Sequence, residues 1–334
     1  MHHSRGRVAL LGLGPWGRNL LRVLAELGEL RTAFDPSPAA LVHVPSELRA
    51  ESAAAAIADP AVDAVVIASP AAGHYDLARA ALEAGKDVFV EKPLCLDAES
   101  GEKLVALADA GGRVLMTGHV LVYHPAISAL KELMDRGDLG TIRYVSSNRL
   151  NLGQVRETES ILWSFAPHDF AVLLHLLGDA PERVAAHGRA FLRGDRADVT
   201  VTHLDFPGGV GAHIFVSWLH PSKEHRLTVV GDRRMATFAD DGRGGSLTVH
   251  DVGVDMVDGR EIHRRNGEAI VPLPPVEPLR AELIHFLECC DRRTEPLTGG
   301  RHGLEVVRLL AAADESARAG GRPVPFVADP RRPR

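Results

Sequence analysis

Gly12-Leu13-Gly14-Pro15-Trp16-Gly17 directly follows the apolar run Val8-Ala9-Leu10-Leu11 and leads into a helical pattern. A glycine-rich turn between a strand and a helix is typical of a dinucleotide-binding fold. In such a fold the first glycine permits the tight turn, the second lets the backbone approach the pyrophosphate, and the third lets the helix pack closely on the strand. The N–H groups at the start of the helix then face the phosphates. We therefore expect this turn to bind a dinucleotide through Gly12, Gly14, Pro15, Trp16 and Gly17.

Three further apolar runs have polar residues at their ends, as the strands of one parallel sheet would. They are Ala33-Phe34-Asp35, Val65-Val66-Ile67-Ala68 followed by Ser69-Pro70, and Asp87-Val88-Phe89-Val90 followed by Glu91-Lys92-Pro93. In doubly wound folds ligands bind outside the carboxyl ends of the strands. Ser69, Pro70 and Glu91 are therefore expected to lie against the cofactor. His74 opens the next helix, where it either packs beside the cofactor or caps the helix and contacts the core.

Asp35 indicates which dinucleotide is bound. It stands at a strand end about 20 residues after the turn, where a carboxylate can accept hydrogen bonds from both ribose hydroxyls. Pro36 and Ser37 follow it, and no arginine is placed to receive a 2′-phosphate. The cofactor expected from these residues is NAD rather than NADP. The alternative is that Asp35 only begins a turn before the proline.

The spacing of apolar runs and helical patterns predicts two domains. Up to about residue 118, short strands alternate with helices, which is typical of an α/β Rossmann domain, and we assign this domain to residues 1–120. Beyond it, longer strands with alternating burial predict an α+β domain over residues 121–334, with an open, mainly antiparallel sheet and helices on one side. Helices are expected there at about 127–136 and 169–177, with closing helices at 280–290 and 304–319 and a loose tail from Pro323.

Composition excludes several classes of function. Apolar residues make up 45% of the chain and the net charge is −6, with Lys and Arg scattered along the sequence. Without a basic face, no nucleic-acid partner is expected, and no apolar run is long enough for a membrane span. The first residues lead straight into a strand, so we expect no signal peptide and a cytoplasmic protein. Cys95, Cys289 and Cys290 are too few and too badly spaced for a disulfide framework or a metal site.

Lys92 is the candidate for chemistry. It follows an apolar strand and precedes Pro93, which restricts the lysine to extended geometry. An ammonium group there can hydrogen-bond a reacting hydroxyl or carbonyl and stabilise the alkoxide that accompanies hydride transfer. Glu91 would orient the lysine or contact the nicotinamide end. The alternative for this pair is a surface salt bridge at a strand end.

From about Arg7 to Ala319, the chain resembles the Gfo/Idh/MocA oxidoreductases, the glucose–fructose oxidoreductase and inositol dehydrogenase family. The most specific segments are Glu91-Lys92-Pro93, Ser69-Pro70 with His74, and Gly137-Asp138-Leu139-Gly140 before a strand. The resemblance implies a Rossmann domain and a second domain whose open sheet often forms a homodimer or homotetramer. It also implies NAD(P)-linked oxidation or reduction of a sugar or cyclitol, with Lys92 in the active site.

The family's second motif is an Asp followed four residues later by a His on a helix under the substrate. His168 matches the histidine, whereas Ser164 stands where the Asp is expected. The resemblance implies that His168 is a general acid or base, and we expect Ser164 to contact substrate. Pro167 is expected in the first turn of the helix, where the helix N-terminus would lower the pKa of His168. Candidates for the missing carboxylate are Glu157 and Glu159.

Other polar residues border the expected site. His119 follows the fifth strand and is expected at the cofactor. Tyr123 is expected to bind substrate, although Tyr123 and His124 can instead cap the helix that Pro125 begins. Arginines suit a phosphorylated or nucleotide-linked substrate because the guanidinium binds in a bidentate way, and a solvated loop is the alternative. Further candidates flank the loop 150–160 that leads to His168, namely Arg149, Asn151 and Arg156.

Together these residues predict a dehydrogenase or reductase acting on a secondary alcohol of a pyranose-like sugar. The segments Arg149–Gly153 and Trp163–Asp169 resemble those of family members that act on amino-sugar or nucleotide-sugar precursors, so a biosynthetic sugar 3-dehydrogenase or 3-ketoreductase is expected. One alternative is an inositol-type dehydrogenase. The other is a dinucleotide-binding sensor or scaffold without turnover, which Ser164 favours and which Lys92 and His168 oppose.

Overall fold

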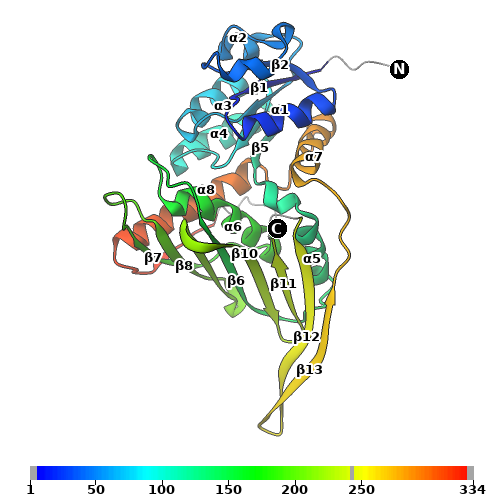
Figure 1. The fold of residues 1–334 in the computed structure, drawn as a ribbon, viewed down its shortest axis with the longest axis vertical. Coiled ribbons are helices and arrows are strands. Elements are labelled where there is room, and N and C mark those ends of the chain that lie inside the picture. The colour runs from blue at the N-terminus through cyan, green and yellow to red at the C-terminus, as the bar shows by residue number, and fades with distance from the viewer. Residues whose placement is uncertain (1–5, 241–243, 329–334) are drawn as a thin grey trace. The chain divides into compact units, whose positions relative to one another are not determined.

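The computed structural model describes residues 6–240 and 244–328. The chain divides into two compact units, Met1–Val120 with Glu277–Arg308, and Leu121–Val276 with Leu309–Arg334 (Figure 1). The sequence had assigned residues 277–308 to the second domain, whereas their contacts group them with the first unit. Residues 241–243 and the end of the predicted tail, residues 329–334, lie outside the described residues.

The first unit contains a parallel sheet with the strand order β2-β1-β3-β4-β5. The strands are β1 (Val8–Leu11), β2 (Leu30–Phe34), β3 (Ala64–Ile67), β4 (Asp87–Glu91) and β5 (Leu115–Gly118). Every residue of β1, β3, β4 and β5 is buried, which explains why these strands are continuous apolar runs. The predicted Rossmann fold is confirmed.

Helices connect these strands. They are α1 (Gly17–Glu26), α2 (Ala53–Ala58), α3 (His74–Glu83), α4 (Ala98–Gly111) and α7 (Pro278–Arg292), with short 3-10 turns at η1 (Ala40–His43), η2 (Ser46–Leu48) and η3 (Ala71–Gly73). α1 packs against α7 and α3 packs against α4. Local signals set their ends: the Asp97 carboxylate accepts a hydrogen bond from the N–H of Ser100, and Gly112 ends α4 in the left-handed region.

The second unit contains a nine-stranded sheet with the order β13-β12-β11-β10-β6-β9-β8-β7-β14. The strands are β6 (Ile142–Leu152), β7 (Arg183–Arg189), β8 (Val199–Asp205), β9 (Gly211–Ser217), β10 (Leu219–Gly231), β11 (Met235–Ala239), β12 (Ser246–Val257), β13 (Arg260–Ile270) and β14 (Val324–Pro325). All neighbours are antiparallel except β6 and β9, so the predicted mainly antiparallel sheet is confirmed. The tail is not wholly loose, because β14 pairs with β7.

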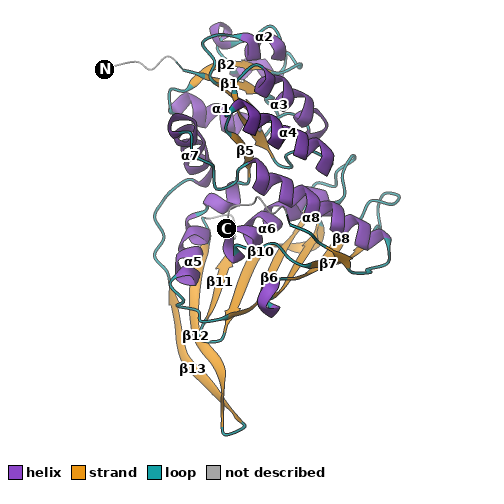
Figure 2. Ribbon diagram, turned by 180° about the vertical axis from the view of Figure 1, so that it is seen from behind, coloured by secondary structure: helices purple, strands orange, loops and turns teal. Residues whose placement is uncertain are grey.

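Helices α5 (Pro125–Asp135) and α6 (Ile161–Leu177) belong to the second unit, with 3-10 turns at η4 (Val120–Tyr123) and η5 (Pro207–Gly209). Helix α8 (Gly300–Arg318) contributes residues to both units. α6 contacts β6, β8 and β9. β12 and β13 form a long two-stranded ribbon that extends beyond the other strands of the sheet (Figures 1 and 2).

The start of α6 was predicted wrongly. The helix begins at Ile161 rather than near Asp169, and Pro167 lies inside it rather than in its first turn. The proline was interpreted as a helix start, but Ile161, Leu162 and Ala166 are fully buried, and their burial stabilises the turns before it. His168 therefore lies seven residues beyond the helix start, and the helix N-terminus gives no reason for a lowered pKa.

Candidate functional site

The glycine-rich turn has the geometry that its sequence predicts. Gly12 has φ +100°, and a Cβ there would lie 2.6 Å from the backbone of Ala68. A Cβ on Gly17 would lie 2.1 Å from the carbonyl oxygen of Gly12. By contrast, a Cβ on Gly14 would meet no atom within 4 Å. The outer glycines are thus required by internal packing, whereas the space beside Gly14 is open, as a bound pyrophosphate needs.

Asp35 at the end of β2 is tied to this turn. Its Oδ2 accepts a hydrogen bond of 2.7 Å from the N–H of Leu13, and its Oδ1 accepts one of 2.8 Å from the N–H of Ser37. The second bond is the turn that the alternative interpretation expected. Each carboxylate oxygen has a further lone pair, so both can still accept ribose hydroxyls.

Glu91 at the end of β4 also contacts the turn. Its Oε1 lies 2.5 Å from the indole Nε1 of Trp16, and its Oε2 accepts from the backbone N–H of Lys92 at 3.3 Å. Glu91 is only 9% exposed. Burial raises the pKa of Glu91 to about 7. The hydrogen bond from the Trp16 indole and the charge of Lys92 lower this pKa, but burial has the larger effect. The indole hydrogen bond connects the turn to the Glu91-Lys92-Pro93 segment.

Lys92 lies next to two buried histidines. Burial lowers the pKa of His74, and the nearby charge of Lys92 lowers it further. The His74 ring contacts two carbonyl oxygens, with Nδ1 2.7 Å from Pro93 and Nε2 2.9 Å from Ser69. His74 therefore holds together the loops that follow β3 and β4. This is the core contact given as one alternative; a contact with cofactor remains a prediction.

His119, directly after β5, is the second histidine near Lys92. Burial lowers the pKa of His119 well below its usual range, and the neighbouring His302 and Lys92 add to this effect. The His302 ring, on α8, lies 5.6 Å away, centroid to centroid. Within the described residues, neither ring nitrogen of His119 has a hydrogen-bond partner. His119 is thus a neutral imidazole in the first unit, and its predicted contact with cofactor remains a prediction.

In the second unit, the α6 residues Ser164 and His168 are four positions apart, so both lie on one side of the helix. Asp169 is fully engaged elsewhere. Its Oδ1 accepts a 2.6 Å hydrogen bond from Ser147, and its Oδ2 lies 2.8 Å from the Nε of Arg149. Arg149 also reaches this carboxylate through Nη2 at 3.2 Å. The structure therefore gives Arg149 an internal ion pair with Asp169, and its predicted contact with substrate stays a prediction.

His225 and Asp240 extend this cluster, and neither was predicted from the sequence. His225, on β10, is the cross-strand partner of Arg149, and its Nδ1 lies 3.6 Å from Asp240 Oδ2. Burial lowers the pKa of His225, and the charge of Arg149 lowers it further. The missed signal is the alternation in β10, where His225 occupies an inward position in series with Leu227 and Val229.

The remaining predicted substrate residues have varied surroundings. Tyr123 is buried in η4, and His124 caps α5 by accepting a hydrogen bond of 3.1 Å from the N–H of Ala126, so the capping alternative holds for His124. Asn151 on β6 has a buried Oδ1 with no hydrogen-bond partner among the described residues. The loop carboxylates are held in ion pairs, Glu157 with Arg193 at 3.1 Å and Glu159 with Arg156 at 3.7 Å.

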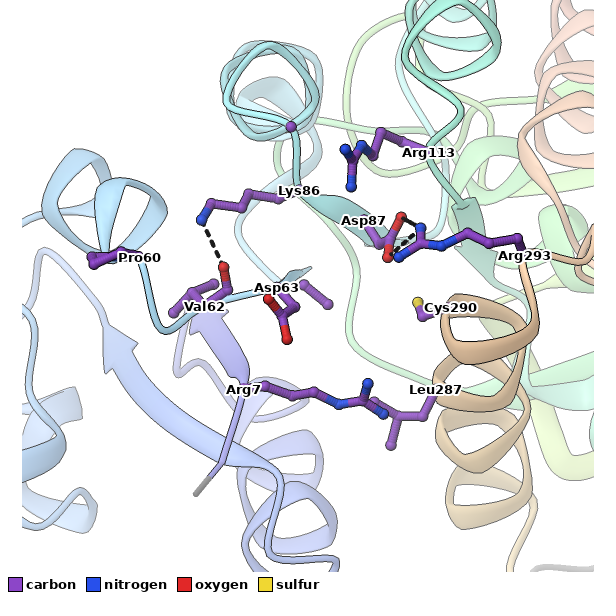
Figure 3. Close-up of a pocket in the computed structure, with 12 residues that line it drawn as sticks. Arg7, Pro60, Val62, Asp63, Lys86, Asp87, Arg113, Leu287, Cys290 and Arg293 are labelled. Atoms are coloured by element: carbon purple, nitrogen blue, oxygen red, sulfur yellow. Dashed lines mark hydrogen bonds and ion pairs between the residues drawn. The ribbon is translucent and has the colours of Figure 1, made fainter. Parts of the chain in front are cut away.

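A cavity of about 290 Å³ in the first unit is lined by none of the predicted site residues. Figure 3 shows Asp63, Asp87 and Arg113 around it, and these residues precede or begin β3, β4 and β5. It is therefore at the amino ends of the strands, opposite the expected cofactor edge. Among residues 6–240 and 244–328, no group of three metal-ligating side chains is found. No helix in these ranges is long and apolar enough to span a membrane.

Known proteins are similar to this chain along nearly its whole length. Residues 6–119 match the family described as "Oxidoreductase family, NAD-binding Rossmann fold", and residues 127–237 match the GFO/IDH/MocA C-terminal domain. UDP-N-acetylglucosamine 3-dehydrogenase from Acidithiobacillus ferrooxidans is 29% identical over 92% of this chain and 95% of its own. Its solved structure superimposes with a TM-score of 0.82 at 26% identity, covering 94% of this chain and 97% of that one. A scyllo-inositol 2-dehydrogenase (NAD(+)) from Bacillus subtilis is 28% identical over 67% of this chain and 71% of its own.

Proposed function

This chain belongs to the Gfo/Idh/MocA family of oxidoreductases, and we propose that it transfers hydride between NAD and a secondary alcohol or ketone of a sugar. The observation that carries the proposal is the segment Glu91-Lys92-Pro93, which connects to the glycine-rich turn through the Glu91–Trp16 hydrogen bond. This contact joins the turn expected to bind dinucleotide to the lysine expected to act on substrate. The alternative of a binding protein without turnover needs no lysine at this point.

The proposed substrate is an amino sugar or nucleotide sugar oxidised or reduced at carbon 3 in a biosynthetic pathway. The support is the match over nearly the whole chain to a protein named UDP-N-acetylglucosamine 3-dehydrogenase. The second candidate is a cyclitol, because an inositol dehydrogenase matches at nearly the same identity. An inositol 2-dehydrogenase from Rhizobium meliloti also matches nearly the whole chain, 93% of it, but at 25% identity. The higher identity of 29% over 92% of the chain favours the nucleotide sugar.

In the proposed reaction, Lys92 hydrogen-bonds the reacting oxygen and stabilises its negative charge. His168 takes the hydroxyl proton during oxidation and returns it during reduction. The bound NAD supplies the hydride acceptor. For each turnover in the oxidative direction, the C–H electron pair leaves as hydride, the O–H proton passes to the base, and the alcohol becomes a ketone.

NAD is the proposed cofactor, with NADP disfavoured. The fit rests on the open space beside Gly14 and on the Asp35 carboxylate, whose oxygens already accept two backbone N–H groups. A carboxylate at this point repels a 2′-phosphate, and Pro36, Ser37 and Pro38 offer it no cation.

A homodimer or homotetramer formed through the exposed face of the second sheet is also proposed. Ser147 faces α6, so by strand alternation Ser146 faces the other way. The strand register places further residues on this side, which we call the open face: Tyr144, Ser146, His213, Phe215, Thr228 and Thr237. Its mixture of aromatic and small polar residues, with Tyr144 46% exposed, suits contact between protein surfaces.

The test is a titration of the purified protein with NADH and NADPH by nucleotide fluorescence, followed by UDP-, TDP- and phospho-sugars and by inositols. We expect tight NADH binding, weaker NADPH binding and a further signal change with a UDP-amino sugar. A response only to an inositol would select the second candidate. Failure of both nucleotides to bind would contradict the roles of Gly12, Gly14 and Asp35.

A further inference from the structure

Glu282 on α7 is a buried acid for which the proposed reaction has no use. Its side chain is 0% exposed. Neither carboxylate oxygen has a hydrogen-bond partner in the described part of the chain. A buried polar group without partners is expensive, and a charged one far more so. An ionised Glu282 would therefore be an unpaired charge in the interior of the first unit.

The packing of α7 on β4 identifies the neighbour of Glu282. The Phe286 ring on α7 lies edge-on against the Phe89 ring on β4, with centroids 5.7 Å apart. Glu282 is one helical turn, about 6 Å, before Phe286 on the same side of α7. Glu91 is two residues, about 6.6 Å, beyond Phe89 on the same side of β4. Because the two steps are of similar length, they place the two carboxyl groups in one region. Burial is the first cause of the raised pKa of Glu282, and the charge of Glu91 is the second.

The surroundings of the two carboxyl groups differ in one respect. Glu91 receives the Trp16 indole N–H and the Lys92 backbone N–H, and the Lys92 charge is close. On the β5 side stands Gly118, where a Cβ would lie 3.0 Å from Glu91 Oε1, so that strand brings no charge. α7 contributes Glu282, whose charged neighbour is Glu91. Among residues 6–240 and 244–328, the hydrogen-bond donors thus stabilise a negative charge on Glu91, whereas Glu282 receives none.

We propose that Glu282 is a positioning residue that remains a neutral carboxylic acid, so that the single negative charge of the pair stays on Glu91 and holds the Trp16 indole of the glycine-rich turn. Two interacting carboxyl groups share protons as one system, and here the donors decide which of them is charged. A charge-assisted hydrogen bond is about twice as strong as a neutral one. The turn is therefore fixed most firmly while Glu91 is ionised.

The first test measures the proton on Glu282 without any cofactor. In unfolded protein a glutamate ionises at about pH 4.3. If folded Glu282 keeps its proton above this pH, folding binds a proton and stability falls as pH rises. The wild-type unfolding constant, relative to that of Glu282→Gln, should then increase about tenfold per pH unit from about pH 5 to about pH 7. The control is Glu288→Gln, which changes an exposed glutamate on the same helix. The ratio of the wild-type unfolding constant to that of Glu288→Gln should not change with pH. A flat ratio for Glu282→Gln would show that Glu282 is ionised, and would overturn the proposal.

The second test locates the charge. The indole N–H resonance of Trp16, assigned with Trp16→Phe, should titrate in cofactor-free protein as Glu91 ionises, with a midpoint near neutral pH. Glu282→Gln should leave the midpoint unchanged, because a neutral amide replaces a neutral acid. A clear fall of the midpoint in Glu282→Gln would mean that a negative charge has been removed, and the proposal would be wrong. In Glu91→Gln, this titration should disappear.

The consequence for cofactor rests on the proposed function. NADH affinity should weaken about fivefold as pH falls through the Glu91 titration, and Glu91→Gln should show the weaker affinity at every pH. Strong NADH binding with no dependence on Glu91 would contradict the role of the charge in the turn. Absence of NADH binding would contradict the proposed function instead, while the unfolding and resonance measurements would still decide the state of Glu282.

Discussion

At the residue scale, the end of β4 brings two oppositely charged neighbours into different surroundings. Strand alternation sends Glu91 and Lys92 to opposite sides of the chain; Glu91 is buried against the turn, whereas Lys92 is half-buried. The glutamate thus holds the turn, and the ammonium group is the one that we propose acts on substrate. Both residues were predicted from the sequence as a unit. The Trp16–Glu91 bond was not, because no local pattern reports a contact across 75 positions.

Replacement of Lys92 tests its role in the reaction. Lys92→Met removes the charge that stabilises the alkoxide, so we expect kcat to fall about 100- to 10,000-fold. NADH affinity should change less than about threefold, since the proposed nucleotide contacts lie in the turn and at Asp35. Lys103→Met, on the exposed side of α4, is the matched control. Near-normal turnover by Lys92→Met would remove the lysine from the mechanism.

Ser164 tests whether this chain departs from the family pattern for a reason. In Ser164→Asp, a carboxylate would stand four residues before His168 on the same side of α6. We expect kcat/KM for the native sugar to fall about tenfold, because a substrate contact is replaced by a buried charge. Ser164→Ala should lose less. A gain of activity in Ser164→Asp would instead indicate a weakened natural site and favour the sensor alternative.

At the element scale, α6 shows how a local signal can mislead. Pro167 was interpreted as the first turn of a helix, yet the apolar side chains before it are buried and the helix runs through it. β12 and β13 were not predicted from the sequence, because here the local signal is weak rather than misleading. β13 is exposed at every position but one, and its exposed residues are mostly polar, which hides the strand pattern. The signal that predicts the hairpin is the turn Asp258-Gly259, in which both residues have positive φ.

Pro167 inside α6 is expected to cost stability. A proline in a helix interior lacks the N–H that would bind the carbonyl of Trp163, a defect of about 3 kcal/mol in isolated helices. Burial of the ring recovers part of this, so Pro167→Ala should raise the free energy of unfolding by about 1 kcal/mol in urea titrations. Pro125→Ala is the control, because Pro125 is the first residue of α5, where proline is favoured. A loss of stability in Pro167→Ala would show that ring packing outweighs the missing bond.

At the scale of the whole molecule, both sheets were predicted in kind, because their apolar patterns differ. Parallel strands buried on both faces are continuous apolar runs, whereas the antiparallel strands alternate. The place of α7 in the first unit could not be predicted, since α7 lies far along the chain from the strands it covers. The Phe89–Phe286 contact and the Glu91–Glu282 pair depend on that long-range packing.

The proposed oligomer is also a property of the whole molecule. Tyr144→Arg would place a charge at the open face, and we expect sedimentation velocity to show a shift from dimer or tetramer toward monomer. Val42→Arg, an exposed position in η1, is the control and should leave the wild-type assembly unchanged. An unchanged assembly in Tyr144→Arg would place the interface elsewhere, and a monomeric wild type would refute the proposed oligomer.

The most direct test of the proposed function is reduction of NAD by the purified enzyme with UDP-N-acetylglucosamine, compared with the same sugar carrying deuterium at carbon 3. Hydride transfer from that carbon predicts NADH formation, deuterium in the reduced nicotinamide and slower turnover of the labelled sugar. NADH formation without transfer of the label would move the reaction to another carbon. No NADH formation with any nucleotide sugar, alongside turnover of an inositol, would contradict the proposed substrate class.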